Sequence, residues 1–153
     1  MDFTHDIWLV GCIPLMEYSM GLYFVIWGVE FTDEFGVWRG GLSEVEPESV
    51  AYTIGLLEAL GPNLGHPHSS GINGWKHSQM RELRIQHQGE PYRALYAFDP
   101  LRNEILLIGG KKMGDNRWYD RFAPVADRLY DGRLKALIEE GLWGGKKVRG
   151  PEK

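Results

Sequence analysis

Basic side chains alternate with apolar ones in two neighbouring segments of this chain. Arg84 alternates away from Leu83 and Ile85 in the first segment, and Arg93 alternates away from Ala94 in the second. Successive side chains of a β-strand point to opposite faces, so both arginines are expected on one polar face of a small sheet. A guanidinium group can hold two phosphoryl oxygens at once. The chemistry that these residues favour is stabilisation of a bound phosphate.

Two further positions with chemical potential follow later in the chain. Lys112, with Lys111 as its substitute, lies where a third strand gives way to a loop, and could bind phosphate or assist proton transfer. Tyr119 lies where the chain leaves the sheet and begins its last helix. A tyrosine there could act as an acid or a base if nearby cations lowered its pKa. The alternative is an amphipathic core residue whose hydroxyl is satisfied at the edge.

Three strands and one helix must position these residues. Alternation and turn residues predict strands over 82–87, 92–98 and 104–108, joined by short connections at 88–91 and 99–103. The third strand is apolar on both faces, as in a central, doubly covered strand, and Gly109-Gly110 is predicted to end it. A final helix is predicted over about 117–137. Residues 82–108 therefore indicate an antiparallel meander.

The first seventy-five residues provide scaffold. A first strand is expected within 20–31, followed by a helix with Thr32 as its N-cap. That helix is in doubt further on, because Gly36, Gly40 and Gly41 each cost roughly 1 kcal/mol relative to alanine. A second helix is predicted from apolar residues at helical spacing, ending at Gly61-Pro62.

Composition indicates one compact domain in a reducing compartment. The chain has 153 residues, of which 43% are hydrophobic, and a single cysteine, Cys12, which excludes an internal disulfide framework. The apolar run 7–16 is too short to span a bilayer and follows acidic residues rather than basic ones. We expect a cytoplasmic protein without a membrane segment.

Charge is distributed unevenly along the chain. The net charge is −4, but residues 1–75 hold one basic and ten acidic residues, whereas residues 76–121 hold nine basic and six acidic ones. An acidic helical half beside a basic sheet is compatible with local attraction of phosphate, and equally with an ordinary mixed surface.

An ordered series of motifs resembles a known family. The series ELR, YRALYAFDP, ILLIGGKK, GDNRWYDRF and ADRLY resembles the phage-derived HigB-like branch of the RelE/HigB toxin superfamily, the ribosome-dependent messenger RNA interferases of type II toxin–antitoxin pairs. The resemblance extends from about residue 27 to about residue 134, and includes 27–35 and 60–68. It implies an α+β, RelE-like fold with two N-terminal helices, a small twisted, mainly antiparallel sheet of about four strands, and a C-terminal helix.

The resemblance also implies a function and roles for single residues. It implies an endoribonuclease that cleaves messenger RNA without a metal, by attack of the ribose 2′-hydroxyl on the adjacent phosphorus. Arg84 and Arg93 would then stabilise the phosphate, and Lys112 and Tyr119 would complete the catalytic set, Tyr119 either in proton transfer or by stacking on a base. The alternative for the two arginines is a solvated strand face or a salt bridge to Glu82 or Asp120.

Other basic residues are expected to contact RNA or to have no special role. Lys76, Arg81, Lys111 and Arg117 are predicted RNA contacts, and His87 is expected in the core. His66 and His68 flank a proline without a matched pair of ligands, which falls short of a zinc site. We expect no metal and no cofactor.

The domain predictions are an extension at 1–19, a toxin domain at 20–140 and a flexible basic tail at 141–153. Residues 1–19 are either a real extension or upstream of a true start at Met20. The expected partners are messenger RNA, the ribosome and an antitoxin, often a helix-turn-helix protein in this family. A second hypothesis is a RelE-fold binding module that has lost catalysis and pairs with an antitoxin or a phage-related partner.

Overall fold

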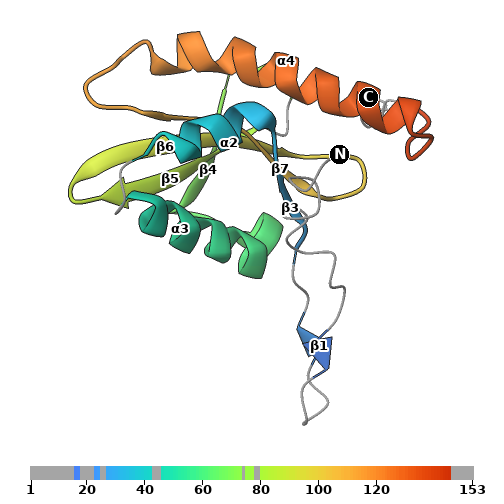
Figure 1. Ribbon diagram of the computed structural model, residues 1–153, viewed down its shortest axis with the longest axis horizontal. Helices are drawn as coiled ribbons and strands as arrows, with labels where there is room; N and C mark the ends of the chain where they lie inside the picture. The colour runs from blue at the N-terminus through green and yellow to red at the C-terminus, as the bar shows by residue number, and fades with distance from the viewer. Residues whose placement is uncertain are drawn as a thin grey trace, which may run out of the picture.

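The computed structural model describes residues 16–17, 23–24, 27–42, 46–73, 75–77 and 80–145 (Figure 1). Most of the predicted extension at 1–19, and residues 146–153 of the predicted tail, lie outside the described residues. The elements are, in chain order, β1 (Met16–Glu17), β2 (Tyr23–Phe24), β3 (Val29–Phe31), α2 (Asp33–Gly40), α3 (Glu46–Leu60), the 3-10 turn η1 (Gly61–Asn63), β4 (Ser69–Gly71), β5 (Arg81–His87), β6 (Glu90–Phe98), β7 (Glu104–Lys111) and α4 (Trp118–Glu139).

The main sheet has the strand order β3-β7-β6-β5-β4. β3 runs parallel to β7, and the other neighbours are antiparallel, so the predicted meander of β5, β6 and β7 is confirmed. β1 and β2 pair with each other. The expectation of about four strands is corrected to five in the described part of the chain. The strand that was missed, β4, has the sequence Ser-Ser-Gly, which carries no apolar alternation and is held in place by its pairing with residues 81–83.

The strand β7 extends three residues further than predicted. Gly109 and Gly110 do not end it, and they lie inside the strand because two tryptophan rings occupy the space beside them. A Cβ atom on Gly109 would lie 2.2 Å from the ring of Trp38, and one on Gly110 would lie 2.9 Å from Nε1 of Trp118. Glycine within a strand often marks such a close approach.

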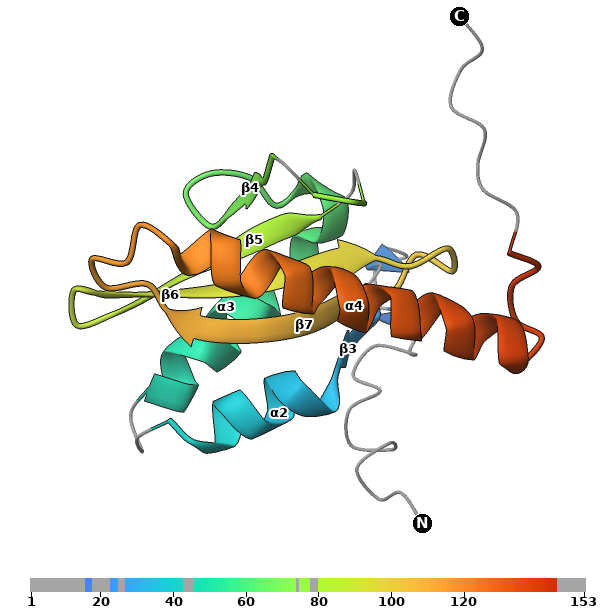
Figure 2. The ribbon, with the colours of Figure 1, turned by 90° about the horizontal axis from the view of Figure 1, so that it is seen from above.

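Helices cover both faces of the sheet (Figure 2). α2 and α3 pack on one face, where Phe35, Ile54 and Leu57 meet strand residues such as Leu83 and Leu106. α4 packs on the other face, where Ala126 and Trp118 meet a second set of strand residues. The predicted pair of N-terminal helices and the predicted C-terminal helix are therefore present, and β7 is covered on both faces.

Thr32 caps α2 as predicted. Its Oγ1 accepts a hydrogen bond from the backbone N–H of Phe35 at 3.1 Å, which satisfies one of the free donors at the helix start. The helix continues through Gly36 and ends at Gly40, because burial of Phe35 and packing of Trp38 outweigh the low helix propensity of glycine. None of the described helices is long and apolar enough to cross a membrane.

Candidate functional site

Arg84 and Arg93 are direct cross-strand partners on β5 and β6. Their neighbours Leu83, Ile85 and Ala94 belong to the core under α2 and α3, so the two arginines project toward the face that α4 covers. The side chain of Arg84 is 35% exposed and that of Arg93 is 12% exposed. The alternation of strand residues predicted this orientation from the sequence.

Glu82 lies at the centre of this pair, and its side chain is only 4% exposed. One carboxylate oxygen accepts hydrogen bonds from Nε of Arg84 and from the hydroxyl of Ser70, both at 2.9 Å. The other accepts a hydrogen bond from the hydroxyl of Tyr119 and lies 3.6 Å from Nε of Arg93. A single buried carboxylate thus joins the two arginines on the sheet to the tyrosine at the start of α4.

These contacts set the ionisation of Glu82 and Tyr119. Burial alone would raise the pKa of Glu82, but hydrogen bonds from Tyr119, Ser70 and Arg84 outweigh it and hold that pKa below its ordinary value. Burial, followed by the hydrogen bond to the Glu82 carboxylate, raises the pKa of Tyr119 to about 12, and Arg93 offsets only part of this rise. The net effect is therefore a raised pKa for Tyr119, contrary to the expectation that nearby cations could lower it. Its phenol is protonated at neutral pH and can donate a proton.

Lys112 and Lys111 lie on opposite faces of the sheet. A β-bulge separates the pairs Leu95–Ile108 and Tyr96–Leu106, so the side-chain alternation of β7 changes phase at Leu107. Beyond the bulge Lys112 continues from the Arg93 side, and its Nζ lies 4.6 Å from the centre of the Tyr119 ring. Lys111 instead pairs with Glu90 at 2.7 Å. The structure brings Lys112 to the site and takes Lys111 away from it.

The other predicted RNA contacts lie apart from this centre. Lys76 pairs with Asp131 of α4 at 2.7 Å, and thereby holds the loop before β5 against that helix. Arg81 points to the α3 face, where its Nε donates to the hydroxyls of Ser69 and Tyr96 at 3.2 and 3.3 Å. Arg117 is exposed immediately before α4. These geometries describe structural contacts for Lys76 and Arg81, and their contact with RNA stays a prediction.

Two of the described histidines, His87 and His77, make contacts that stabilise the fold. His87 lies on the α3 face, as expected, and its Nδ1 is 2.8 Å from the hydroxyl of Ser49. His77 lies 2.8 Å from a carboxylate oxygen of Asp131 and packs edge-on against Tyr130. Over the described residues, no group of three or more histidine, cysteine, aspartate or glutamate side chains could hold a metal ion.

Sequence reasoning assigned Glu82 only as a possible salt-bridge partner and missed its central position. The spacing of two residues between Glu82 and Arg84 was a usable signal, because such residues share one face of a strand. Nothing in the sequence indicated the hydrogen bond from Tyr119 to Glu82, because the two residues are 37 positions apart in the chain.

Comparison with known proteins identifies the family to which this chain belongs. The profile of the phage-derived Gp49-like proteins matches residues 38–131. The chain belongs to this family. Two relatives of this Gp49-like chain are proteins of Mycobacterium tuberculosis that carry HigB names, which confirms the resemblance to HigB-like proteins. "Putative toxin HigB3" is 44% identical over 98 residues, which are 63% of this chain and 84% of that protein. "Putative toxin HigB2" is 38% identical over 104 residues, which are 67% of this chain and 52% of that protein. No solved structure matches significantly.

Proposed function

We propose that this Gp49-like protein is the toxin of a type II toxin–antitoxin pair and inhibits translation in the cytoplasm by ribosome-dependent cleavage of messenger RNA. The observation that carries the proposal is the convergence of Arg84, Arg93 and Tyr119 on Glu82. Its HigB-named relatives, described as toxins, support the same function. Its partners would be messenger RNA, the ribosome and an antitoxin, which we expect to be a helix-turn-helix protein.

The reaction would proceed by internal attack on the RNA backbone. The ribose 2′-oxygen gives up its proton to solvent and bonds to phosphorus, the bond to the 5′-oxygen breaks, and that oxygen takes up a proton. Arg84 and Arg93 would bind the phosphoryl oxygens and stabilise the extra negative charge of the transition state. A fixed guanidinium pair suits this task because little reorganisation is needed when the charge develops.

Tyr119 would supply the proton for the departing 5′-oxygen. A phenol with a pKa of about 12 is still a stronger acid than an alcohol, so it can protonate a leaving alkoxide. Glu82 would act as a positioning residue, because a carboxylate with a lowered pKa is a weak base but a strong acceptor for the groups that it orients. Lys112 would add a third cation beside the Tyr119 ring.

A second function is favoured by the same carboxylate. Glu82 already pairs with both arginines, which reduces the positive charge that they offer to a phosphate. This pairing fits a binding module that keeps the fold and the antitoxin surface but has lost turnover.

One experiment separates the two functions. The full chain is expressed from an inducible promoter, alone and together with the antitoxin expected to be encoded by a small adjacent gene, and messenger RNA 5′ ends are mapped in the cells. If the protein is a toxin, growth should stop and the antitoxin should relieve the arrest, with new 5′ ends inside translated codons. Normal growth with folded protein and unchanged messages would exclude the nuclease and favour the binding module.

A further inference from the structure

A cavity of about 600 Å³ opens along the edge of β5, next to the arginine pair. The strand β4 pairs with the edge of β5 only as far as Leu83. One more backbone hydrogen bond follows, in which the N–H of Arg84 donates to the carbonyl of His68 at 2.7 Å. Beyond that point the cavity lies between the β5 edge and the first half of α3. Arg84 and Arg93 both contribute to its wall. Whatever binds there is adjacent to a phosphate held by these arginines.

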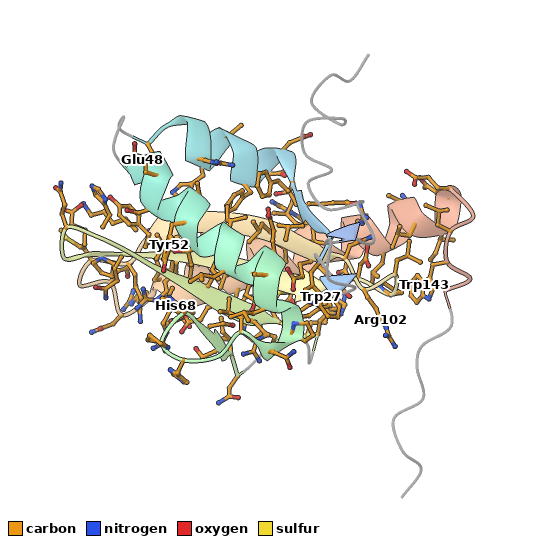
Figure 3. The ribbon with its side chains drawn as sticks, turned by 90° about the horizontal axis from the view of Figure 1, so that it is seen from below. Trp27, Glu48, Tyr52, His68, Arg102 and Trp143 are labelled. Atoms are coloured by element: carbon orange, nitrogen blue, oxygen red, sulfur yellow. The ribbon has the colours of Figure 1, made fainter. Side chains whose placement is uncertain are left out.

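Tyr52 supplies an aromatic wall to this cavity. It is 65% exposed, whereas the other aromatic side chains whose burial the structure describes are buried or partly buried, and it projects from α3 on the same side as His68 (Figure 3). Its neighbours Val50 and Ile54 are buried in the core, so the Tyr52 ring is not needed to hold α3 on the sheet. An exposed aromatic ring beside arginines is a common platform for a nucleic-acid base.

Polar groups complete the cavity at fixed positions. The hydroxyl of Ser49 is 2.8 Å from Nδ1 of His87, and the hydroxyl of Thr53 donates to the carbonyl of Ser49 at 3.0 Å, so this part of the wall is held to β5 and to its own helix. Gln86 and Glu48 are exposed at the rim. Their amide and carboxylate groups can pair with the donors and acceptors on a base edge.

We propose that this cavity binds one unstacked nucleobase of single-stranded RNA, with its ring against Tyr52 and its phosphate on Arg84 and Arg93. A volume of about 600 Å³ lies within the range of small-molecule sites, and phosphate recognition alone would require no aromatic wall. The inference rests on the proposed function, since it takes the RNA of that reaction as the ligand. It adds a base-recognition site on α3 to the catalytic groups on the sheet.

The test uses the full chain and a fluorescently tagged single-stranded RNA with 2′-O-methyl riboses, which cannot be cleaved by 2′-hydroxyl attack. Binding is followed by fluorescence anisotropy over a series of salt concentrations. Tyr52→Ala should weaken binding about tenfold, as expected for the loss of one stacked base, and Tyr52→Phe should bind like the original protein. The exposed Leu60, at the far end of the same helix, provides the matched control Leu60→Ala, which should change nothing.

Salt dependence separates stacking from charge. Tyr52→Ala should lower affinity at every salt concentration without changing the slope of log K against log salt, because no cation is removed. Arg84→Ala should reduce that slope by about one unit. Overturning results would be no RNA binding by the original protein, unchanged binding by Tyr52→Ala, or an equal loss with Tyr52→Phe. An unchanged RNA affinity with loss of the antitoxin complex would also overturn the proposal and assign the cavity to a protein.

The outcomes for the cavity and for the nuclease can be told apart. RNA binding that depends on Tyr52, in a protein that cleaves no message, would sustain the base site and exclude the nuclease. Cleavage by Tyr52→Ala at the original rate and at the original positions would exclude the base site and sustain the nuclease.

Discussion

Two buried glutamates in the same sheet behave in opposite ways. Glu82 on β5 is 3% exposed and Glu104 on β7 is fully buried. Glu82 has hydrogen-bond donors at both oxygens, and its pKa is lowered. Neither carboxylate oxygen of Glu104 has a hydrogen-bond partner in the described part of the structure, and burial, with a smaller contribution from Glu58, raises its pKa to about 8.

The difference shows what keeps a carboxylate charged inside this protein. Burial disfavours the charged form at both positions, and only at Glu82 do donors outweigh it. Glu82 lies on the α4 face among arginines, whereas Glu104 lies at the start of β7 on the α3 face, on the side of the sheet that holds the apolar Leu106. The α4 face is therefore organised around a fixed anion, and the α3 face holds a mostly neutral acid at pH 7.

The largest expected effect on RNA cleavage comes from removing either of the two arginines that pair with Glu82. Arg84→Ala and Arg93→Ala should each lower the cleavage rate about 10²- to 10³-fold, because one fixed cation at the transition state is lost. Each variant should abolish toxicity in the growth assay while circular dichroism shows a folded protein. Arg93→Ala should also lose roughly 1–3 kcal/mol of stability, since it leaves the buried Glu82 less compensated.

Arg128→Ala is the matched control for those variants. Arg128 is exposed on α4, so its removal changes the net charge equally without touching Glu82. If Arg84→Ala or Arg93→Ala stays as toxic as Arg128→Ala, the catalytic assignment of that arginine is wrong.

Glu104 should make stability depend on pH in a window where Glu82 does not. Its folded pKa of about 8 lies above its ordinary value of 4.5, so the folded state binds more protons between these values. The contribution to stability is complete below about pH 4.5 and is lost as pH rises through about 8, at up to about 1.4 kcal/mol per pH unit. Urea unfolding at a series of pH values between about 4.5 and 9 measures this slope, and the loss of stability between about pH 4.5 and 8 amounts to roughly 5 kcal/mol in total.

Glu104→Gln isolates that slope. The amide is uncharged and similar in shape, so the variant should equal the original protein near pH 4.5 and exceed it in stability by an amount that grows until about pH 8. Every other group is common to both proteins, so its contribution cancels in the difference. Parallel stability curves for the two proteins would show that Glu104 is charged in the folded state, contrary to its burial.

The same substitution at Glu82 should have the opposite result. Glu82→Gln removes the charge that pairs with Arg84 and Arg93 and should cost about 2 kcal/mol at pH 7, whereas Glu104→Gln should raise stability there by roughly 3 kcal/mol. The pKa of Tyr119 should fall from about 12, because its carboxylate partner is gone. Nuclear magnetic resonance of ring-labelled tyrosine measures that change, and equal unfolding free energies for the two glutamine variants would contradict the comparison.

The sequence predicted the parts of this comparison that follow from local periodicity. Alternation in β5 and β6 was sufficient to orient Arg84 and Arg93, and an apolar run was sufficient to identify β7 as central. It could not predict β4, whose three small residues have no pattern of their own. Nor could it predict the Tyr119–Glu82 contact, because the packing of α4 against the sheet is a long-range property.

The sequence could not show which of Lys111 and Lys112 lies on the α4 face, because a β-bulge separates them from the start of β7. The bulge at Leu107 adds one residue to β7 and exchanges the faces of every residue after it. Without the bulge, simple alternation from Ile105 would place Lys111 on the α4 face. The sequence contains no glycine at Leu107 to announce the change, since Gly109 and Gly110 follow it.

The different faces of Lys111 and Lys112 lead to the smallest of the expected effects on the cleavage rate. Lys112→Ala should lower cleavage about tenfold, because it removes a cation from the side of the sheet that holds Glu82 and Tyr119. Lys111→Ala is the matched control, since it removes the same charge from a neighbouring position that pairs with Glu90 on the other face. It should change the rate by less than about twofold, because a partly exposed ion pair contributes little. Single-turnover cleavage rates distinguish the two variants. Equal losses would mean that charge near the end of β7 matters irrespective of face, and a greater loss for Lys111→Ala would place the working face of the sheet on the side of α3.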